Sequence, residues 1–353
     1  MDRFLDAIIL FCLVKLNGER SISAVYHLFT GKKTSQTIQD SHLFGLDRFF
    51  GTFPSLSREE LAAVVDKYER AGYIKNLSNH KYALTGEGMT VCHNYLQESP
   101  IPHHLNGWKH QSKAELVWKR LSLLIQTLSY IVRHEKRFYP IQKDYKVQAW
   151  VKGFIASHQL SRDELAEAVL LEMTSLLDHS DSRSNDIFVM RLSSHGKTGL
   201  TFRQISEQTG LEESRAYYLF LEVLHLLAGS LQAGREAYPV LNRLIDGPAG
   251  RSAQITQSTL ATYQYLLQGM DKKSIGQVRR LKESTIEDHI VELALMIPDF
   301  DLSPYIPESL TNEIIQTAAK GSSRKLREIK ESLTGRASYF QIRLVLARFG
   351  GTL

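Results

Sequence analysis

The chain contains few residues whose types and spacing suit catalysis or metal binding. The segment TGKKTS at 30–35 shares a Gly-Lys step with phosphate-binding loops, but such a loop needs a glycine where Tyr26 stands. His103 and His104 are adjacent, whereas a helical metal site places two histidines four residues apart. No nucleophile elbow, paired-glycine fingerprint or kinase motif is present. We therefore expect a protein that is not an enzyme, with no cofactor and no metal.

The other candidate binding features are electrostatic, because basic and acidic residues form separate runs along the last hundred residues. Positions 272–282 contain five basic and no acidic residues, 283–313 eight acidic and no basic, and 320–348 eight basic and two acidic. One such run is most often a solvated helix face. The basic runs could equally bind DNA or the acidic tail of a single-stranded-DNA-binding protein. The candidate contacts are Lys272, Lys273, Arg279, Arg280, Lys282, Arg324, Lys325, Arg327, Lys330 and Arg343.

The middle of the chain interleaves basic and aromatic residues. Between Lys109 and Lys152 there are ten basic and three acidic residues, with Trp108, Trp118 and Trp150 within or beside this stretch. This pattern could form a platform for a single nucleic-acid strand. Most of these aromatic residues, however, lie at helical spacing beside leucines, which favours a core role.

Composition and the positions of capping, turn and linker residues predict a mainly α, multi-domain protein. Residues 1–97 show helical periodicity, a capping box at SREE (57–60) and two short strand patterns, which together indicate a winged-helix-like domain. A proline-containing joint separates this domain from a helical middle domain, 110–245, and the segment DGPAGRSAQ (246–254) separates the middle domain from a C-terminal domain, 255–353. Cys12 and Cys92 are expected to be reduced core residues, and no apolar run approaches the roughly 18 residues that cross a bilayer.

Two segments have the pattern of a helix-turn-helix. In the first, at 201–227, Gly210 marks the turn, while Ile205, Leu211, Ala216 and Leu219 face inward. Its outward positions are acidic, aromatic or apolar, which would repel phosphate and suits a protein partner or an internal interface. The candidate partner-binding residues there are Tyr217, Tyr218 and Leu221.

In the second segment, IGQVRRLKESTIEDHI at 275–290, Ile275, Leu281 and Ile286 face inward and Arg280 occupies the usual glycine position of the turn. The helix that would enter a DNA groove carries Glu283, Glu287 and Asp288, which are further candidates for partner binding. Three acids beside a polyanion are unfavourable, so this face also favours a protein partner.

These motifs carry a resemblance to a known family. The arrangement around STIEDHI, followed by LREIKESL and SYFQIRLVLA, resembles the helix-turn-helix domain at the C-terminus of many RecQ-type helicases. With GLTFRQISEQTGL and the N-terminal segment, the whole chain resembles the YpbB family of low-GC Gram-positive bacteria. The sequence departs from that pattern at Gly276, where alanine is usual, and at Arg280, where glycine is usual.

The resemblance implies a non-catalytic accessory protein that docks a RecQ-type helicase and assists it at forks or single-stranded DNA in repair or replication. Such a protein is expected to be cytoplasmic and nucleoid-associated, without membrane contact. Two other hypotheses remain open at this point. One is a transcription regulator that binds duplex DNA, expected to be dimeric on palindromic sites. The other is a scaffold that contacts no nucleic acid.

Overall fold

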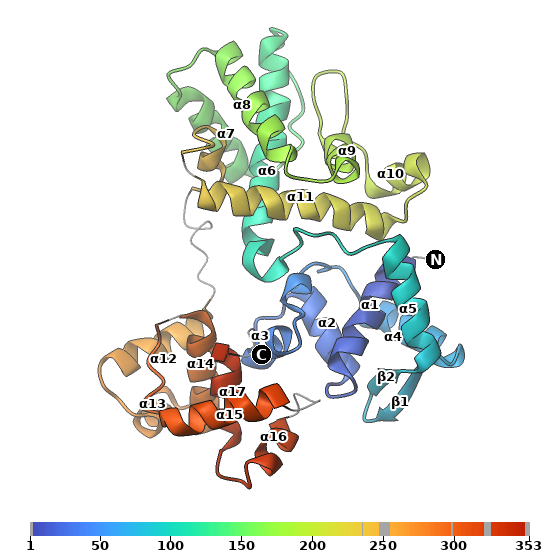
Figure 1. The fold of residues 1–353 in the computed structure, drawn as a ribbon. Coiled ribbons are helices and arrows are strands. Elements are labelled where there is room, and N and C mark those ends of the chain that lie inside the picture. The colour runs from blue at the N-terminus through green and yellow to red at the C-terminus, as the bar shows by residue number, and fades with distance from the viewer. Residues whose placement is uncertain (1–2, 235, 247–254, 298, 321–325, 350–353) are drawn as a thin grey trace. The chain divides into compact units, whose positions relative to one another are not determined.

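The structure is a computed structural model that describes residues 3–234, 236–246, 255–297, 299–320 and 326–349 (Figure 1). Over these residues the chain forms 17 α-helices and one two-stranded sheet, which confirms the mainly helical prediction. The chain divides into two compact units. Unit 1 contains residues 1–10 and 91–252, and unit 2 contains residues 11–90 and 253–353. The C-terminal segment thus shares a unit with most of the N-terminal segment, a grouping that the three predicted domains do not contain.

The N-terminal segment forms helices followed by a hairpin. Ser57 and Glu60 make the predicted capping box, and the helix that they open ends before Gly72, whose φ is +75°. The hairpin turns at Asn79 and His80, whose φ angles of 49° and 58° are those of a two-residue type I′ turn. The elements are α1 (Arg3–Leu16), α2 (Ile22–Thr30), α3 (Ser35–Leu43), η1 (Asp47–Phe49), α4 (Arg58–Arg70), β1 (Ile74–Ser78), β2 (Lys81–Leu84) and α5 (Gly86–Glu98).

Unit 1 is built around two long helices, α6 and α11, which pack against each other (Figure 1). The segment from α6 onward contains α6 (Gly107–Val132), α7 (Tyr145–Ser157), α8 (Arg162–Leu177), α9 (Ser182–Arg191), α10 (Phe202–Thr209), α11 (Glu213–Ala233) and η2 (Leu241–Ile245). Trp118 packs edge-on against Phe188 and Phe220, with ring centroids 5.9 and 4.7 Å away. Trp150 stacks on Phe154 at 4.9 Å. These two tryptophans therefore belong to the packed interior, as their helical spacing predicted.

The C-terminal segment of unit 2 is centred on α14. This helix packs against α12, α13 and α17, and also against α3 of the N-terminal segment (Figure 1). The elements are α12 (Gln257–Leu267), α13 (Lys272–Arg279), α14 (Glu283–Met296), α15 (Glu308–Lys320), α16 (Leu326–Ser332) and α17 (Tyr339–Phe349). Among all helices in the described ranges, none combines the length and the apolar character that a membrane span requires.

Candidate helix-turn-helix interface

The first helix-turn-helix consists of α10 and α11. Gly210 adopts the left-handed conformation at the turn, with φ 71°, where a side chain would be strained. Ile205 and Ala216 are fully buried, and the hydroxyl of Ser206 donates to the carbonyl of Leu211 at 2.5 Å, so the two helices meet closely at this corner. The pattern that predicted this motif is therefore confirmed in its geometry.

The outward face of α11 is covered by the start of α1, within unit 1. The backbone N–H groups of Arg3 and Phe4 donate to the carboxylate of Glu212 at 3.2 and 3.1 Å, which places a negative charge at the positive end of the α1 dipole. The hydroxyl of Tyr95 donates to the same carboxylate at 2.6 Å. The ring of Phe4 packs edge-on against Tyr218 at 5.6 Å.

This cover corrects the assignment of two predicted partner contacts. Tyr218 is fully buried and Leu221 is 8% exposed, so both are part of the interior of unit 1. Tyr217 is half-buried and packs edge-on against Phe202, and desolvation raises the pKa of its hydroxyl to about 12. The physical reason is that α11 packs against α6, α9 and α10 at once, which leaves little of its surface exposed. The sequence pattern left a protein partner or an internal interface open for the outward face of α11, and the structure shows an internal interface.

The second helix-turn-helix consists of α13 and α14. Ile275 and Ile286 are fully buried, as predicted. Arg280 has φ 53° and takes the left-handed position that glycine usually fills, while its side chain stays exposed. A Cβ on Gly276 would lie 3.0 Å from the carbonyl oxygen of Leu281, so the glycine permits a close approach at this turn.

The charged side chains of the α13–α14 motif are partly neutralised by contacts within unit 2. The ammonium group of Lys272 lies 2.7 Å from the carboxylate of Glu287 and 3.5 Å from that of Glu283. The same group lies 4.5 Å from the centroid of the Phe340 ring, a cation–π contact. Lys272 is therefore a bridge between α13, α14 and α17, with little capacity left for a phosphate.

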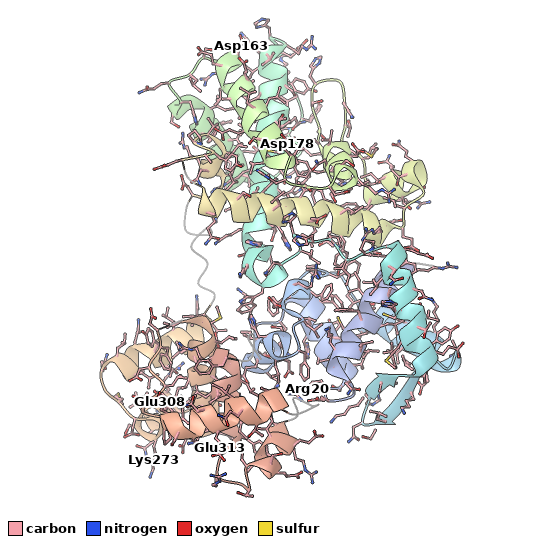
Figure 2. The ribbon with its side chains drawn as sticks, viewed as in Figure 1. Arg20, Asp163, Asp178, Lys273, Glu308 and Glu313 are labelled. Carbon is pink, nitrogen blue, oxygen red and sulfur yellow. The ribbon has the colours of Figure 1, made fainter. Side chains whose placement is uncertain are left out.

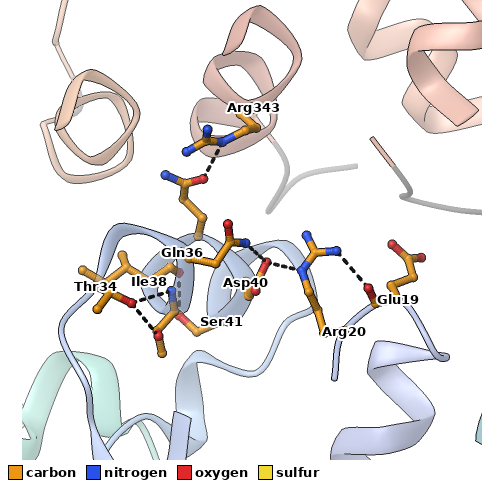
Figure 3. Close-up of polar contacts among 10 residues, drawn as sticks. Glu19, Arg20, Thr34, Gln36, Ile38, Asp40, Ser41 and Arg343 are labelled. Carbon is orange, nitrogen blue, oxygen red and sulfur yellow. Dashed lines mark hydrogen bonds and ion pairs between the residues drawn. The ribbon is translucent and has the colours of Figure 1, made fainter. Parts of the chain in front are cut away.

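Arg343 on α17 connects three helices of unit 2, and Figure 3 shows its side chain reaching toward α3. Its Nε donates to Oε1 of Gln39 on α3 at 2.8 Å, and its second terminal nitrogen donates to Asp288 on α14. Beside it on α3, Asp40 pairs with Arg20 at 2.9 Å. Desolvation raises the pKa of Asp40, while the Arg20 charge acts in the opposite direction. The sequence pattern predicted Arg343 and Asp288 as accessible binding residues. In the structure they pair with each other inside unit 2 instead.

Arg279 has a structural role as well. Its guanidinium donates to the carbonyl oxygen of Ser258 at 2.7 Å and to the hydroxyl of Thr262, which ties α13 to α12. His289 of α14 shares the Thr262 hydroxyl at 2.7 Å. Desolvation, with the neighbouring Arg279 charge, lowers the pKa of His289 to about 4.

The second helix of this motif is enclosed by its neighbours. Residues 289–294 of α14 are all buried, because α3, α12 and α17 pack around it. A helix that reads bases in a major groove must present an exposed face to the DNA. In this structure the exposed residues of α14 lie in its first turn, and Glu287 and Asp288 in the second turn are half-buried and paired.

The exposed remainder forms a small surface at the turn, which we call the corner face. It consists of Arg280, Lys282 and Glu283, all exposed; Lys273 is also exposed, at the other end of α13. Lys273 projects outward from α13 (Figure 2). The Arg280 and Lys282 side chains make no ion pair or hydrogen bond among the described residues. The corner face is thus the accessible part of the predicted site on this motif.

The second predicted basic surface is dispersed. Arg327 is exposed and pairs with Glu331 one helical turn away, and Lys330 lies 4.2 Å from the centroid of the Tyr339 ring. Arg324 and Lys325 lie outside the described residues. The helix that carries Arg327 and Lys330, α16, packs against α15 and α17, whereas α13 packs against α12 and α14.

Replacement of Arg343 tests its connecting role. We expect Arg343→Ala to destabilise unit 2 by about 1–3 kcal/mol, because it removes two charge-assisted hydrogen bonds to partly buried partners. The matched control is Arg327→Ala, whose pair is 81% and 62% exposed and should contribute less than about 1 kcal/mol. Hydrogen exchange of peptides from α14 and α17 measures both variants. Equal protection in the two variants would show that Arg343 does not connect the helices.

Comparison with known proteins places these motifs in a family. Among the described residues, no group of three or more His, Cys, Asp or Glu side chains could hold a metal ion. Residues 258–346 match the model of a helix-turn-helix domain, which covers α13 and α14. No solved structure matches the chain. The chain is 36% identical over 346 residues to Protein YpbB of Bacillus subtilis (strain 168), an alignment that covers 98% of this chain and 97% of that protein. The chain therefore belongs to the YpbB family.

Proposed function

We propose that the protein is a non-catalytic adaptor that docks a RecQ-type DNA helicase and assists it at forks or single-stranded DNA during repair or replication. The observation that carries this proposal is the enclosure of both second helices, α11 and α14, by other helices of their own units. A protein that keeps helix-turn-helix motifs but leaves only the start of α14 and little of α11 exposed is suited to contacts with proteins. The resemblance of its C-terminal domain to that of RecQ-type helicases supplies the class of partner.

The corner face is the docking contact that we propose for the helicase. Its two basic side chains and one acidic side chain lie at the turn between α13 and α14. Charges at a rim guide the approach of a partner and select it, even where they add little affinity. The helices and hairpin of residues 11–90, which we interpret as a winged helix, form a further protein-binding element of unit 2 in this proposal.

Titration with the helicase tests the proposal. We expect the purified full chain to bind a RecQ-type helicase of the same bacterium in isothermal titration calorimetry. The double reversal Arg280→Glu and Lys282→Glu should weaken this binding by about tenfold or more, because two attractive contacts become repulsive. The matched control is the double reversal Lys143→Glu and Lys146→Glu, which changes the same charge on exposed residues at the start of α7 in unit 1.

Two results would contradict the proposal. One is the absence of helicase binding by the unmodified chain at micromolar concentrations. The other is tight binding to a single duplex sequence in a selection from random duplexes, which would support a transcription regulator. Equal weakening by the two double reversals would move the docking contact away from the corner face.

A further inference from the structure

Unit 1 contains an open groove, away from both helix-turn-helix motifs in the sequence. It has a volume of about 900 Å³ and is lined by residues between Leu123 and Arg162. Four basic side chains line it, Lys136, Arg137, Lys152 and Arg162, and no acidic side chain does. The first three are exposed and make no ion pair among the described residues. Grooves lined by one sign of charge concentrate the field and attract ligands of the opposite sign.

The loop that forms one wall of the groove is held in place by α6. The side chain of Gln126, which is 7% exposed, donates to the carbonyl oxygen of Tyr139 at 3.2 Å and accepts from the N–H of Ile141 at 2.9 Å. Gln142 donates to the hydroxyl of Ser122 at 3.0 Å. A buried glutamine that satisfies both its donor and its acceptor on one loop fixes the backbone of that loop.

On this fixed backbone, the loop presents aromatic rings beside the basic groups. The ring of Phe138 stacks on Tyr130 of α6, with centroids 4.7 Å apart and planes at 27°. Tyr139, the next residue, is 97% exposed and makes no ring contact among the described residues. A tyrosine that lines the groove and is almost fully exposed has no role in the core. Its ring faces are available for stacking.

We infer that this groove binds single-stranded nucleic acid, with the phosphates along Lys136, Arg137 and Lys152 and an unstacked base on the ring of Tyr139. Proteins that bind single strands without sequence preference combine a basic groove with aromatic rings that stack on bases. Duplex DNA fits less well, because its bases are already stacked and cannot cover the Tyr139 ring. This site lies in a different unit from the corner face and does not depend on helicase docking.

An acidic, apolar peptide is the competing occupant, since it would also match the charge of the groove. A peptide anchor needs a closed apolar pocket, whereas the most accessible apolar surface here is a tyrosine ring open on its faces. The single strand is therefore the occupant that the exposed ring favours. The two occupants differ in their response to the variants below.

Fluorescence anisotropy of the full chain with a labelled oligothymidylate tests the inference. We expect Tyr139→Ala to weaken binding by about 5- to 100-fold, the range measured for the loss of one stacked base. The matched control is Tyr145→Ala, because Tyr145 is 80% exposed at the start of α7 but does not line the groove. The double reversal Lys136→Glu and Arg137→Glu should reduce the slope of log affinity against log salt by about 1.4. Lys197→Glu, on an exposed residue of unit 1, should leave that slope nearly unchanged by comparison.

The corner-face double reversal and a peptide probe complete the design. The inference predicts that Arg280→Glu with Lys282→Glu leaves oligothymidylate binding intact. Equal affinities for Tyr139→Ala and Tyr145→Ala would overturn it. So would the absence of oligothymidylate binding together with Tyr139-dependent binding of a synthetic peptide of alternating aspartate and phenylalanine. If the unmodified chain bound oligothymidylate but not the helicase, the proposed function would be contradicted and this inference would stand.

Discussion

Glu222→Ala is expected to destabilise unit 1 by about 3–5 kcal/mol, the largest effect that we predict for a single substitution. The carboxylate of Glu222 is 4% exposed on α11. It accepts from the N–H of His104 at 3.1 Å and from the hydroxyl of Ser184 at 2.7 Å. It also stabilises the charged form of Arg215, whose pKa is lowered chiefly by desolvation. Alanine would leave a hydroxyl and an amide without this acceptor, and a buried guanidinium without this negative charge.

The tryptophans give a readout specific to unit 1. All three tryptophans of the chain, Trp108, Trp118 and Trp150, lie in unit 1, so urea unfolding followed by tryptophan fluorescence reports on that unit alone. The control variant is Glu222→Gln, which keeps an acceptor oxygen and the side-chain volume. We expect it to lose about 1–2 kcal/mol, because only the charge is removed. If the alanine variant lost less than the glutamine variant, the polar contacts of Glu222 would not stabilise the unit.

Unit 1 is also expected to lose stability in mild acid because of His225. This histidine is 1% exposed, and its Nδ1 accepts from the N–H of Asn106 at 2.9 Å. Desolvation, with a smaller contribution from His110, lowers the pKa of His225 to about 3 from the ordinary 6.5. Protonation at Nδ1 would remove the acceptor of that hydrogen bond and place a charge in the interior.

The sign of the effect follows from proton binding. Below pH 6.5 the unfolded chain binds a proton at His225 while the folded chain does not, down to about pH 3. The stabilisation is therefore fully present above pH 6.5 and is lost as the pH falls from 6.5 toward 3. Between pH 7 and pH 5 the loss should be about 2 kcal/mol from this residue. His110, whose pKa desolvation lowers to about 4, acts in the same direction.

Urea unfolding at pH 7 and pH 5, again followed by tryptophan fluorescence, measures this loss. The variant His225→Asn keeps an acceptor near the N–H of Asn106 but does not titrate in this range. Its unfolding free energy should therefore change by about 2 kcal/mol less between the two pH values than that of the unmodified chain. An identical change in the two proteins would show that His225 is not the group that responds to acid.

Substitutions at the internally bonded residues and at the exposed residues of the candidate site have different meanings in a binding experiment. Substitutions at Arg343 or Arg279 would remove internal contacts, so weaker binding by such variants would reflect a change in unit 2 itself. Substitutions at Arg280 and Lys282 change exposed charges only. Loss of binding by the latter is the result that identifies a contact.

The sequence alone determined the local structure of this protein. The capping box at Ser57, the turn glycine at 210 and the two short strand patterns predicted helices, turns and a hairpin that the structure contains. The inward residues Ile205, Ile275 and Ile286 were also predicted, because helical periodicity records which face is apolar. The family resemblance was visible in the same motifs.

Only the tertiary structure decided which charged and aromatic residues are available. Periodicity predicted Tyr218 and Asp288 as outward residues of a helix pair, but it does not say whether a third element covers that face. The start of α1 covers Tyr218, and Arg343 reaches Asp288 from α17. The sequence contained only a weak indication that Lys136, Arg137 and Tyr139 form a binding surface. Their surface depends on a loop that Gln126 holds against α6, and such a contact between segments leaves no periodic pattern in the sequence.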